Sequence, residues 1–209
     1  MEFWNDAVTE ESWKRLIELN KEIDMVLIGG WAIYLYTHLS KSKDIDIIVD
    51  YNSMRVLSQK YLVEKNDRLK KYEIKLEKFD IDIYLPKYSR LSPPPEDILS
   101  KYRNQKEGFT LPTPEALLLL KFSAFMERKS SIKGQKDAID ILGMLFYSGI
   151  DFKKMAEIKN TYKVKDLGRT IVSMLRTVDP NSYKYLNLNA KTFSEYKNKS
   201  WQQIRSHLL

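Results

Sequence analysis

The sequence predicts an α+β fold in which a small mixed β-sheet with flanking helices is followed by a C-terminal helical domain. In the N-terminal part, short runs that alternate apolar and polar residues lie between helical patterns, and such alternation is typical of strands. From Thr113 onward the apolar residues recur at helical spacing. Pro93–Pro95 interrupt the chain, so we expect residues 1–92 to form the first domain and residues 93–209 the second.

The composition limits the chemistry that the chain can carry. Among its 209 residues there is no cysteine, and the two histidines are His38 and His207. A disulfide framework, a thiolate metal site and a cysteine nucleophile are excluded, and a zinc site built on histidine is not expected. Oxygen atoms are therefore the ligands that this chain can offer a metal.

The distribution of apolar residues predicts a cytoplasmic protein with no membrane partner. No apolar run approaches the length of about 20 residues that spans a bilayer. The N-terminal segment MEFWNDAVTEES is acidic and polar, unlike a signal peptide.

The net charge of +7 is concentrated in the C-terminal third. Residues 151–209 hold twelve basic and five acidic residues, whereas the rest of the chain holds 23 of each. This asymmetry suggests a polyanionic partner, such as RNA or another nucleic acid, and a solvated lysine-rich surface is the alternative. Tyr183, Tyr196 and Trp201 lie among these lysines, which suits stacking on bases, although such rings more often pack a small helical domain.

A glycine pair follows the first expected strand. Met25–Ile28 form that strand, Gly29 and Gly30 follow it, and Trp31–Thr37 form a short helix. The backbone N–H groups and the positive end of the helix dipole then make a ready phosphate site, with a simple tight turn as the other interpretation. Ser42 comes shortly afterwards and can donate its hydroxyl to a phosphate.

Carboxylates recur with the period of a strand. Asp44 and Asp46 share one face of the expected strand at residues 44–49, and Asp80 and Asp82 share a face of a later strand. Like charges so close disfavour each other's ionisation unless a cation lies between them. Three carboxylates on neighbouring strands can hold two divalent cations about 3.5–4 Å apart, and magnesium prefers such oxygen ligands.

Charged residues also interrupt the apolar helices of the second domain. Lys121 lies within a run of leucines, and Arg128 follows on the same helix face. Lys121 either extends to the surface or reaches a phosphate. In the next helix Lys136 precedes Asp137 and Asp140, which share a face, and a solvated helix start is the alternative interpretation there.

These motifs together resemble the nucleotidyltransferase superfamily that includes DNA polymerase β. Within it, the chain looks most like the minimal nucleotidyltransferases of the AbiEii toxin type and their uncharacterised prokaryotic relatives. The likeness covers roughly residues 24–145 and rests on Gly29-Gly30, Asp44-x-Asp46, a later lone carboxylate, Lys121-x-x-Ala124-x-x-x-Arg128 and Lys136-Asp137-x-x-Asp140. Trp31 stands where small or hydroxyl residues are frequent in the family.

The resemblance implies a role for each matching residue. Two magnesium ions would be bound by Asp44, Asp46 and Asp82, with Asp80 as the alternative to Asp82. Asp137 would position or deprotonate the acceptor and complete the catalytic set. The nucleoside triphosphate would be held by Gly29, Gly30, Ser42, Lys121 and Lys136.

The implied activity is magnesium-dependent transfer of a nucleoside monophosphate from a nucleoside triphosphate to a hydroxyl group. We expect an RNA end, such as that of a tRNA, as the acceptor, and an antitoxin protein as a further partner. The alternatives are a small hydroxylated acceptor such as an aminoglycoside, or a catalytically degenerate domain that binds a nucleotide or a protein.

Overall fold

The computed structural model describes residues 6–209 and divides into two compact units. The first unit ends at Thr113, and the second runs from Pro114 to Leu209. Residues 1–5, with which the expected first domain and its acidic segment begin, lie outside the described residues. Within residues 6–209 no helix is both long and apolar enough to cross a membrane.

The first unit combines helices with short strands, as the sequence predicts. Its elements are α1 (Asp6–Glu22), β1 (Val26–Ile28), α2 (Gly29–Thr37), β2 (Ile45–Ile48), α3 (Tyr51–Lys60), β3 (Glu64–Asn66), β4 (Lys71–Lys75), β5 (Asp80–Tyr84), α4 (Pro95–Lys101), β6 (Arg103–Lys106) and β7 (Phe109–Pro112).

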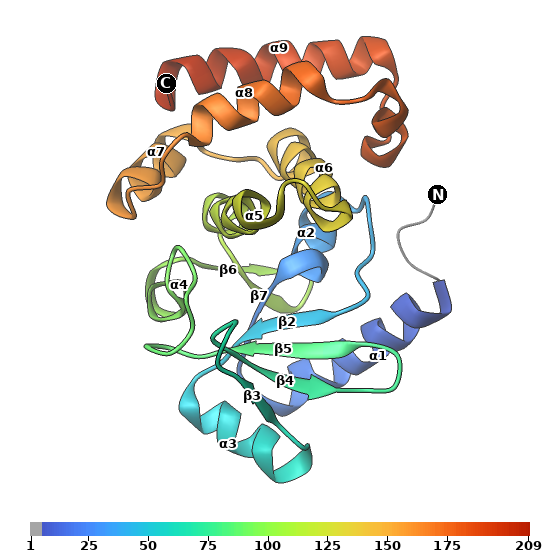
Figure 1. The fold of residues 1–209 in the computed structure, drawn as a ribbon, viewed down its shortest axis with the longest axis vertical. Coiled ribbons are helices and arrows are strands. Elements are labelled where there is room, and N and C mark those ends of the chain that lie inside the picture. The colour runs from blue at the N-terminus through green and yellow to red at the C-terminus, as the bar shows by residue number, and fades with distance from the viewer. Residues whose placement is uncertain (1–5) are drawn as a thin grey trace. The chain divides into compact units, whose positions relative to one another are not determined.

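Five of these strands form one mixed sheet in the order β1-β2-β5-β4-β3. Four of them, β2, β5, β4 and β3, are labelled side by side in Figure 1. β2 and β5 run parallel, and the other neighbours are antiparallel. β2 and β5 are therefore adjacent in the sheet although α3, β3 and β4 separate them in the chain. The prediction of a small mixed sheet with flanking helices is confirmed.

The register of the strands separates the two faces of this sheet. Ile47 pairs with Leu27 on one side and with Ile83 on the other, and all three are buried, so this face belongs to the core. The next pair along the ladder joins Asp46 to Asp82, which lie on the opposite, polar face. Alternation with period two thus places the carboxylates together and away from the core.

The strand β3 was not predicted. The sequence of residues 52–65 predicts one helix, followed by a polar turn. In the structure the helix α3 ends at Lys60, and Glu64–Asn66 pair with β4 at the edge of the sheet. The residues of β3 are polar and largely exposed, so they show no apolar alternation. The strand matters because it places Asn66 beside the polar face.

The expected domain boundary at Pro93–Pro95 falls inside the first unit. The segment that follows forms α4 and a β6–β7 hairpin, of which β6 was not predicted. The Tyr36 hydroxyl donates to the carbonyl of Pro112 at 2.8 Å, and the ring of Trp13 lies 5.5 Å from that of Phe109. These contacts attach the hairpin to the first unit, so the division comes only at the start of the next helix.

The second unit contains helices throughout, which confirms the predicted helical domain. They are α5 (Pro114–Arg128), α6 (Ile132–Tyr147), α7 (Phe152–Thr161), α8 (Leu167–Thr177), the 3-10 helix η1 (Pro180–Leu186) and α9 (Ala190–His207). α5 packs against α6, and α8 lies beside α9 (Figure 1).

Candidate active site

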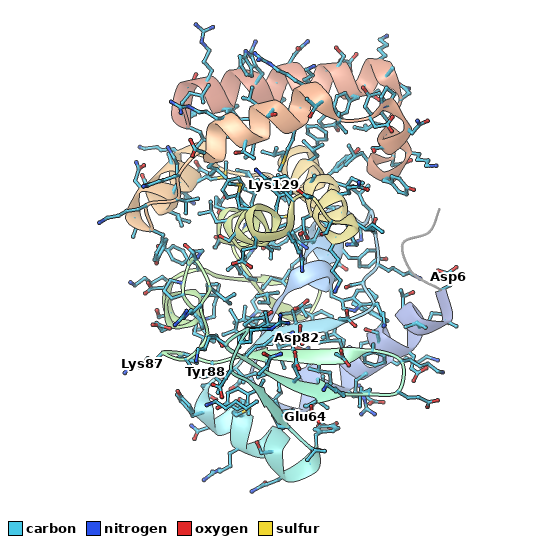
Figure 2. All side chains as sticks on the ribbon, viewed as in Figure 1. Asp6, Glu64, Asp82, Lys87, Tyr88 and Lys129 are labelled. Atoms are coloured by element: carbon cyan, nitrogen blue, oxygen red, sulfur yellow. The ribbon has the colours of Figure 1, made fainter. Side chains whose placement is uncertain are left out.

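Three carboxylates lie in a row across three neighbouring strands of the first unit. Asp46 on β2 is the direct partner of Asp82 on β5, and Asp82 is the direct partner of Glu73 on β4. Asp82 is labelled in Figure 2. Directly opposed residues point to the same face, and neighbouring strands of a sheet lie about 4.7–4.9 Å apart. We call Asp46, Asp82 and Glu73 the carboxylate row.

The other two predicted metal ligands lie one step along the same strands. Asp44 precedes β2, and its Oδ1 accepts a hydrogen bond from the backbone N–H of Asp80 at 3.3 Å. Asp80 is exposed, whereas the side chain of Asp82 is only 17% exposed. The neighbour of Asp46 is thus Asp82, which favours Asp82 over Asp80 as the third carboxylate.

The fit of these groups to a divalent cation is partial. Asp46 and Asp82 offer oxygen donors side by side, which is the chemistry that magnesium prefers. Across residues 6–209, however, no three His, Cys, Asp or Glu side chains form a group that could hold a metal ion. The pair Asp46–Asp82 therefore fits a cation by its chemistry, and Asp44 is not gathered into the same group.

A lysine already engages the carboxylate row. The Nζ of Lys71 lies 2.6 Å from Asp82 Oδ2 and 2.9 Å from Glu73 Oε1, and its side chain is only 13% exposed. Asn66 on β3 donates from Nδ2 to Glu73 Oε1 at 3.0 Å. Lys71, Glu73 and Asn66 were not predicted from the sequence, because the pairing of β3 with β4 and of β4 with β5 carries no local sequence signal.

The row perturbs the ionisation of its members. Burial and the negative charge of Asp46 raise the pKa of Asp82 to about 7, although Lys71 acts in the opposite direction. Burial lowers the pKa of Lys71, but Asp82 and Glu73 raise it by more, so the net shift is upward. For Glu73 burial raises the pKa, but Lys71 and Asn66 outweigh it, and the net shift is downward. At neutral pH, Lys71 is therefore the cation that offsets the repulsion within the row.

We expect Asp82 to make the metal-free protein less stable as the pH rises. Its folded-state pKa lies at about 7 against an ordinary value of 3.8, so between these values the folded protein binds a proton that the unfolded chain does not. This contribution to stability is complete below the ordinary value and is lost as the pH rises through the folded-state pKa. Urea denaturation in EDTA across this range should show a shallower decline for Asp82→Asn, and equal slopes would contradict the assignment.

Gly29 and Gly30, which we call the glycine turn, follow β1 at the start of α2, and Gly29 lies directly against Asp46 of the carboxylate row. Gly29 begins α2 with a φ of 65°, in the left-handed region that favours glycine. A Cβ added to Gly29 would overlap the carboxylate of Asp46, so the absence of a side chain there is what admits Asp46. The start of α2 and the metal-binding candidates thus form one continuous site.

Ser42 and Trp31 occupy defined places around this turn. A Cβ on Gly30 would lie 2.5 Å from Ser42 Oγ, and that hydroxyl donates to the Asp44 carbonyl at 3.1 Å. Trp31 is 1% exposed, and its Nε1 donates to Ser12 Oγ at 2.9 Å. The indole therefore packs against α1 in the core, and its bulk does not fill the turn.

The predicted residues of the second unit form a separate ionic network between α5 and α6. Lys121 Nζ lies 3.1 Å from Asp137 Oδ1 and 3.0 Å from Asp140 Oδ2. Arg128 Nε contacts Asp137 Oδ2 at 2.8 Å, and Lys136 Nζ contacts Asp140 Oδ2 at 3.1 Å. Each aspartate therefore lies between two cations, and three positive charges meet two negative ones.

This network ties the two helices together. The side chains of Asp137 and Asp140 are each only 3% exposed. Burial raises the pKa of Asp140, but the charges of Lys136 and Lys121 outweigh it and lower the pKa overall. Lys121 and Lys136, which the resemblance implies as triphosphate ligands, thus pair with carboxylates inside the second unit.

Replacing Asp140 with asparagine should destabilise the protein by about 3 kcal/mol, because Lys121 and Lys136 then lose a buried counter-charge. Urea denaturation at neutral pH measures this loss. The matched control is Asp166→Asn, whose ion pair with Arg169 is exposed and 3.6 Å long. It should cost less than about 1 kcal/mol.

The pH dependence provides a second test of the same network. Because the folded-state pKa of Asp140 is lowered, its stabilising contribution is complete above the ordinary value of 3.8 and is lost as the pH falls through the folded-state pKa. The difference in stability between the wild type and Asp140→Asn should shrink on acidification. A difference that stays constant would show that the charge of Asp140 is not what stabilises the helices.

The aromatic residues of the C-terminal third pack against other side chains of the second unit. Tyr183 stacks on Phe193 with 4.3 Å between ring centroids, and Tyr196 lies 5.2 Å from Phe146. The guanidinium of Arg176 lies 5.1 Å above the ring of Trp201. These rings thus serve the packing of the second unit.

A hollow with a basic lining lies where α7, α8 and the C-terminal residues come together in the second unit. Its volume is about 620 Å³, and its lining includes Lys159, Lys163, Lys165 and Arg169, with Asp166 as an acidic member. The excess of positive charge found in the sequence is thus partly gathered at one place.

The small mixed sheet, the glycine turn and the aspartates beside it agree with the nucleotidyltransferase class that the sequence motifs resemble. The family model described as a nucleotidyltransferase of unknown function (DUF6036) matches residues 7–199. The chain therefore belongs to this family and is a nucleotidyltransferase by family, which confirms the superfamily resemblance. Its relation to the AbiEii type stays a prediction.

Three solved structures are similar to this chain at low sequence identity, and the first of them has a TM-score above 0.5. JHP933 from Helicobacter pylori is 16% identical, over 98% of this chain and 94% of that chain, with a TM-score of 0.51. An antigenic nucleotidyltransferase-like protein from Paracoccidioides brasiliensis is 17% identical over 88% and 94%, with a TM-score of 0.47. A STING-associated CdnE c-di-GMP synthase from Capnocytophaga granulosa is 15% identical over 98% and 84%, with a TM-score of 0.34. No curated protein matches the sequence significantly.

Proposed function

We propose that the chain is a magnesium-dependent enzyme that transfers a nucleoside monophosphate from a nucleoside triphosphate to a hydroxyl group at an RNA end, such as that of a tRNA. The observation that carries this proposal is the contact between the Asp46 carboxylate and the glycine turn, with Asp82 directly beside Asp46. The proposed cation ligand Asp46 therefore touches the start of α2, where the phosphates would bind.

Asp46 and Asp82 would hold magnesium, with Asp44 as the third ligand in the proposal. When bound, the metal supplies positive charge that favours ionisation of the attacking hydroxyl and stabilises the pyrophosphate leaving group. The chain itself contributes the N-terminus of α2, whose backbone N–H groups and dipole would hold the triphosphate. The glycine at position 29 allows the phosphates and Asp46 to approach the same backbone.

Ser42 and the ionic network of the second unit have supporting roles in this proposal. The Ser42 hydroxyl fixes the Asp44 carbonyl and would keep the turn and the strand β2 in register. Lys121 and Lys136 would contact the triphosphate, and Asp137 would orient the acceptor hydroxyl. To do so, these residues would give up some of the ion pairs of the network, such as Lys121–Asp137 and Lys136–Asp140.

RNA as the acceptor is supported by the basic hollow of the second unit. A positively charged groove binds the phosphate backbone without reading sequence, and such binding weakens steeply with salt. RNA binding that falls steeply with added salt is the expected result, whereas no binding at low salt would exclude this acceptor. An aminoglycoside acceptor would instead need an acidic pocket.

One observation favours a second function, that of a nucleotide-binding or protein-binding domain without catalysis. Lys71 already neutralises Asp82, and the described residues do not gather three carboxylates around one point. A domain that binds a nucleotide without a metal would retain the glycine turn and tolerate this arrangement. Calorimetry with and without magnesium separates the two, because the enzyme requires the metal for triphosphate binding.

The deciding experiment supplies each of the four α-labelled ribonucleoside triphosphates with magnesium and total RNA. Covalent attachment of label to RNA that stops in EDTA is the expected result. Label on no RNA, together with label transferred to an added aminoglycoside, would replace RNA by a small acceptor. Binding of the triphosphate without transfer to either acceptor would support the non-catalytic domain.

A further inference from the structure

Lys71 differs from the other ion-paired lysine on the same strand. The Nζ of Lys75 also lies 2.6 Å from a carboxylate, Glu64 Oε2, but these side chains are 58% and 47% exposed. Lys71 is 13% exposed and contacts two carboxylates, on Asp82 and Glu73, that are similarly shielded from solvent. Two lysines with ion pairs of equal length thus differ mainly in burial and in the number of carboxylates they contact.

The place of Lys71 in the carboxylate row gives its charge a specific task. Asp46, Asp82 and Glu73 occupy adjacent strands in direct register, so their charges repel one another across the sheet. A lysine ammonium has a flexible four-carbon stem and three rotatable donors, so it can move between neighbouring carboxylates. Glu73 is fixed by Asn66 and offers Lys71 a second partner when Asp82 is needed elsewhere.

We propose that Lys71 is a positioning residue that serves as an internal cation for the carboxylate row and competes with the metal for Asp82. Without metal, it bridges Asp82 and Glu73 and keeps the row assembled. When a divalent cation binds Asp46 and Asp82, Lys71 is displaced from Asp82 and stays on Glu73. Lys71 therefore sets how tightly the site binds metal, an inference that rests on the proposed function of the row as a metal site.

Lys71→Met tests this competition, because methionine approximates the stem and removes the charge. Isothermal titration with Mg²⁺ and electron paramagnetic resonance with Mn²⁺ measure metal affinity without depending on catalysis. We expect Kd for both metals to fall at least about tenfold, since the carboxylates lose a neighbouring positive charge. The melting temperature in EDTA should fall by several degrees, and saturating Mg²⁺ should restore most of it.

Two further variants keep the test decisive. Lys75→Met is the matched control, and its metal affinity and melting temperature should stay close to those of the wild type. Glu73→Gln should act in the opposite direction from Lys71→Met: it leaves the ammonium with Asp82 alone, so Kd for metal should rise. This variant also serves if Lys71→Met does not fold.

The outcomes separate this inference from the proposed function. Unchanged metal affinity in both Lys71→Met and Glu73→Gln, or equal effects of Lys71→Met and Lys75→Met, would overturn the role of Lys71. The inference also requires that the wild type binds metal saturably and that Asp46→Asn abolishes this binding. Failure of either result would overturn it as well. A wild type that binds metal and shows the expected variant effects, yet transfers no nucleotide, would refute the proposed function and leave the inference standing.

Discussion

Asp46→Asn should reduce nucleotidyl transfer by about a thousandfold or more, because a metal contributes several kcal/mol of transition-state stabilisation and each 1.36 kcal/mol is a factor of ten in rate. Asparagine keeps the shape of the side chain, so it still fits against Gly29. The negative charge beside Asp82 is lost, which removes repulsion from the row. We therefore expect the melting temperature to be retained or raised. Transfer of label from the preferred triphosphate and thermal unfolding by circular dichroism measure the two effects.

Asp80→Asn is the control for this variant. Asp80 lies on β5 two residues before Asp82, on the same face, but is exposed and at the level of Asp44. Its substitution should change the rate only a few-fold. Full activity in Asp46→Asn would refute the assignment of the site, and inactivity of Asp80→Asn would make Asp80 the third ligand in place of Asp82.

Gly29→Ala should damage both stability and activity. An alanine at a φ of 65° costs about 1–2 kcal/mol in backbone strain. The added methyl group also overlaps the Asp46 carboxylate, which must then move away from the start of α2. Since the same displacement separates the proposed metal ligand from the proposed phosphate site, we expect transfer to fall by more than a hundredfold, on the order of the cost of a 1 Å misplacement.

Gly108→Ala distinguishes the two causes. Gly108 has a φ of 80° in the β6–β7 turn, and a Cβ there would meet nothing within 4 Å. This variant carries the backbone strain without the overlap, so it should lose about the same 1–2 kcal/mol of stability and keep its activity. If Gly29→Ala lost no more stability and no more transfer activity than Gly108→Ala, the contact between Gly29 and Asp46 would not contribute to catalysis.

The core of the site is predictable from the sequence because it depends on local periodicity. Alternation in Asp44-Ile45-Asp46-Ile47 and in Asp80-Ile81-Asp82-Ile83 identifies two strands and the face on which each aspartate lies. The buried isoleucines leave these strands little freedom of register, since a slip of one residue would expose them. The glycine pair marks the turn beside them for an equally local reason.

The partners of this core are not predictable in the same way. Glu73 and Lys71 lie on β4, whose charged and apolar residues alternate with the period of a strand, whereas the edge strand β3 is polar throughout. Which of their side chains meets Asp82 depends on the pairing of β4 with β5, a relation between segments. The ionic network of α5 and α6 is intermediate: helical spacing predicts that Asp137 and Asp140 share a face, but not that Lys121 lies between them.

The parallel pairing of β2 with β5 also determines when the site can exist during folding. Parallel neighbours need a long crossover, and here it consists of α3, β3 and β4. Asp46 and Asp82 meet only after that whole segment has folded back, a non-local event that is slow compared with helix formation. A nascent chain therefore acquires this pair of carboxylates only when its sheet closes.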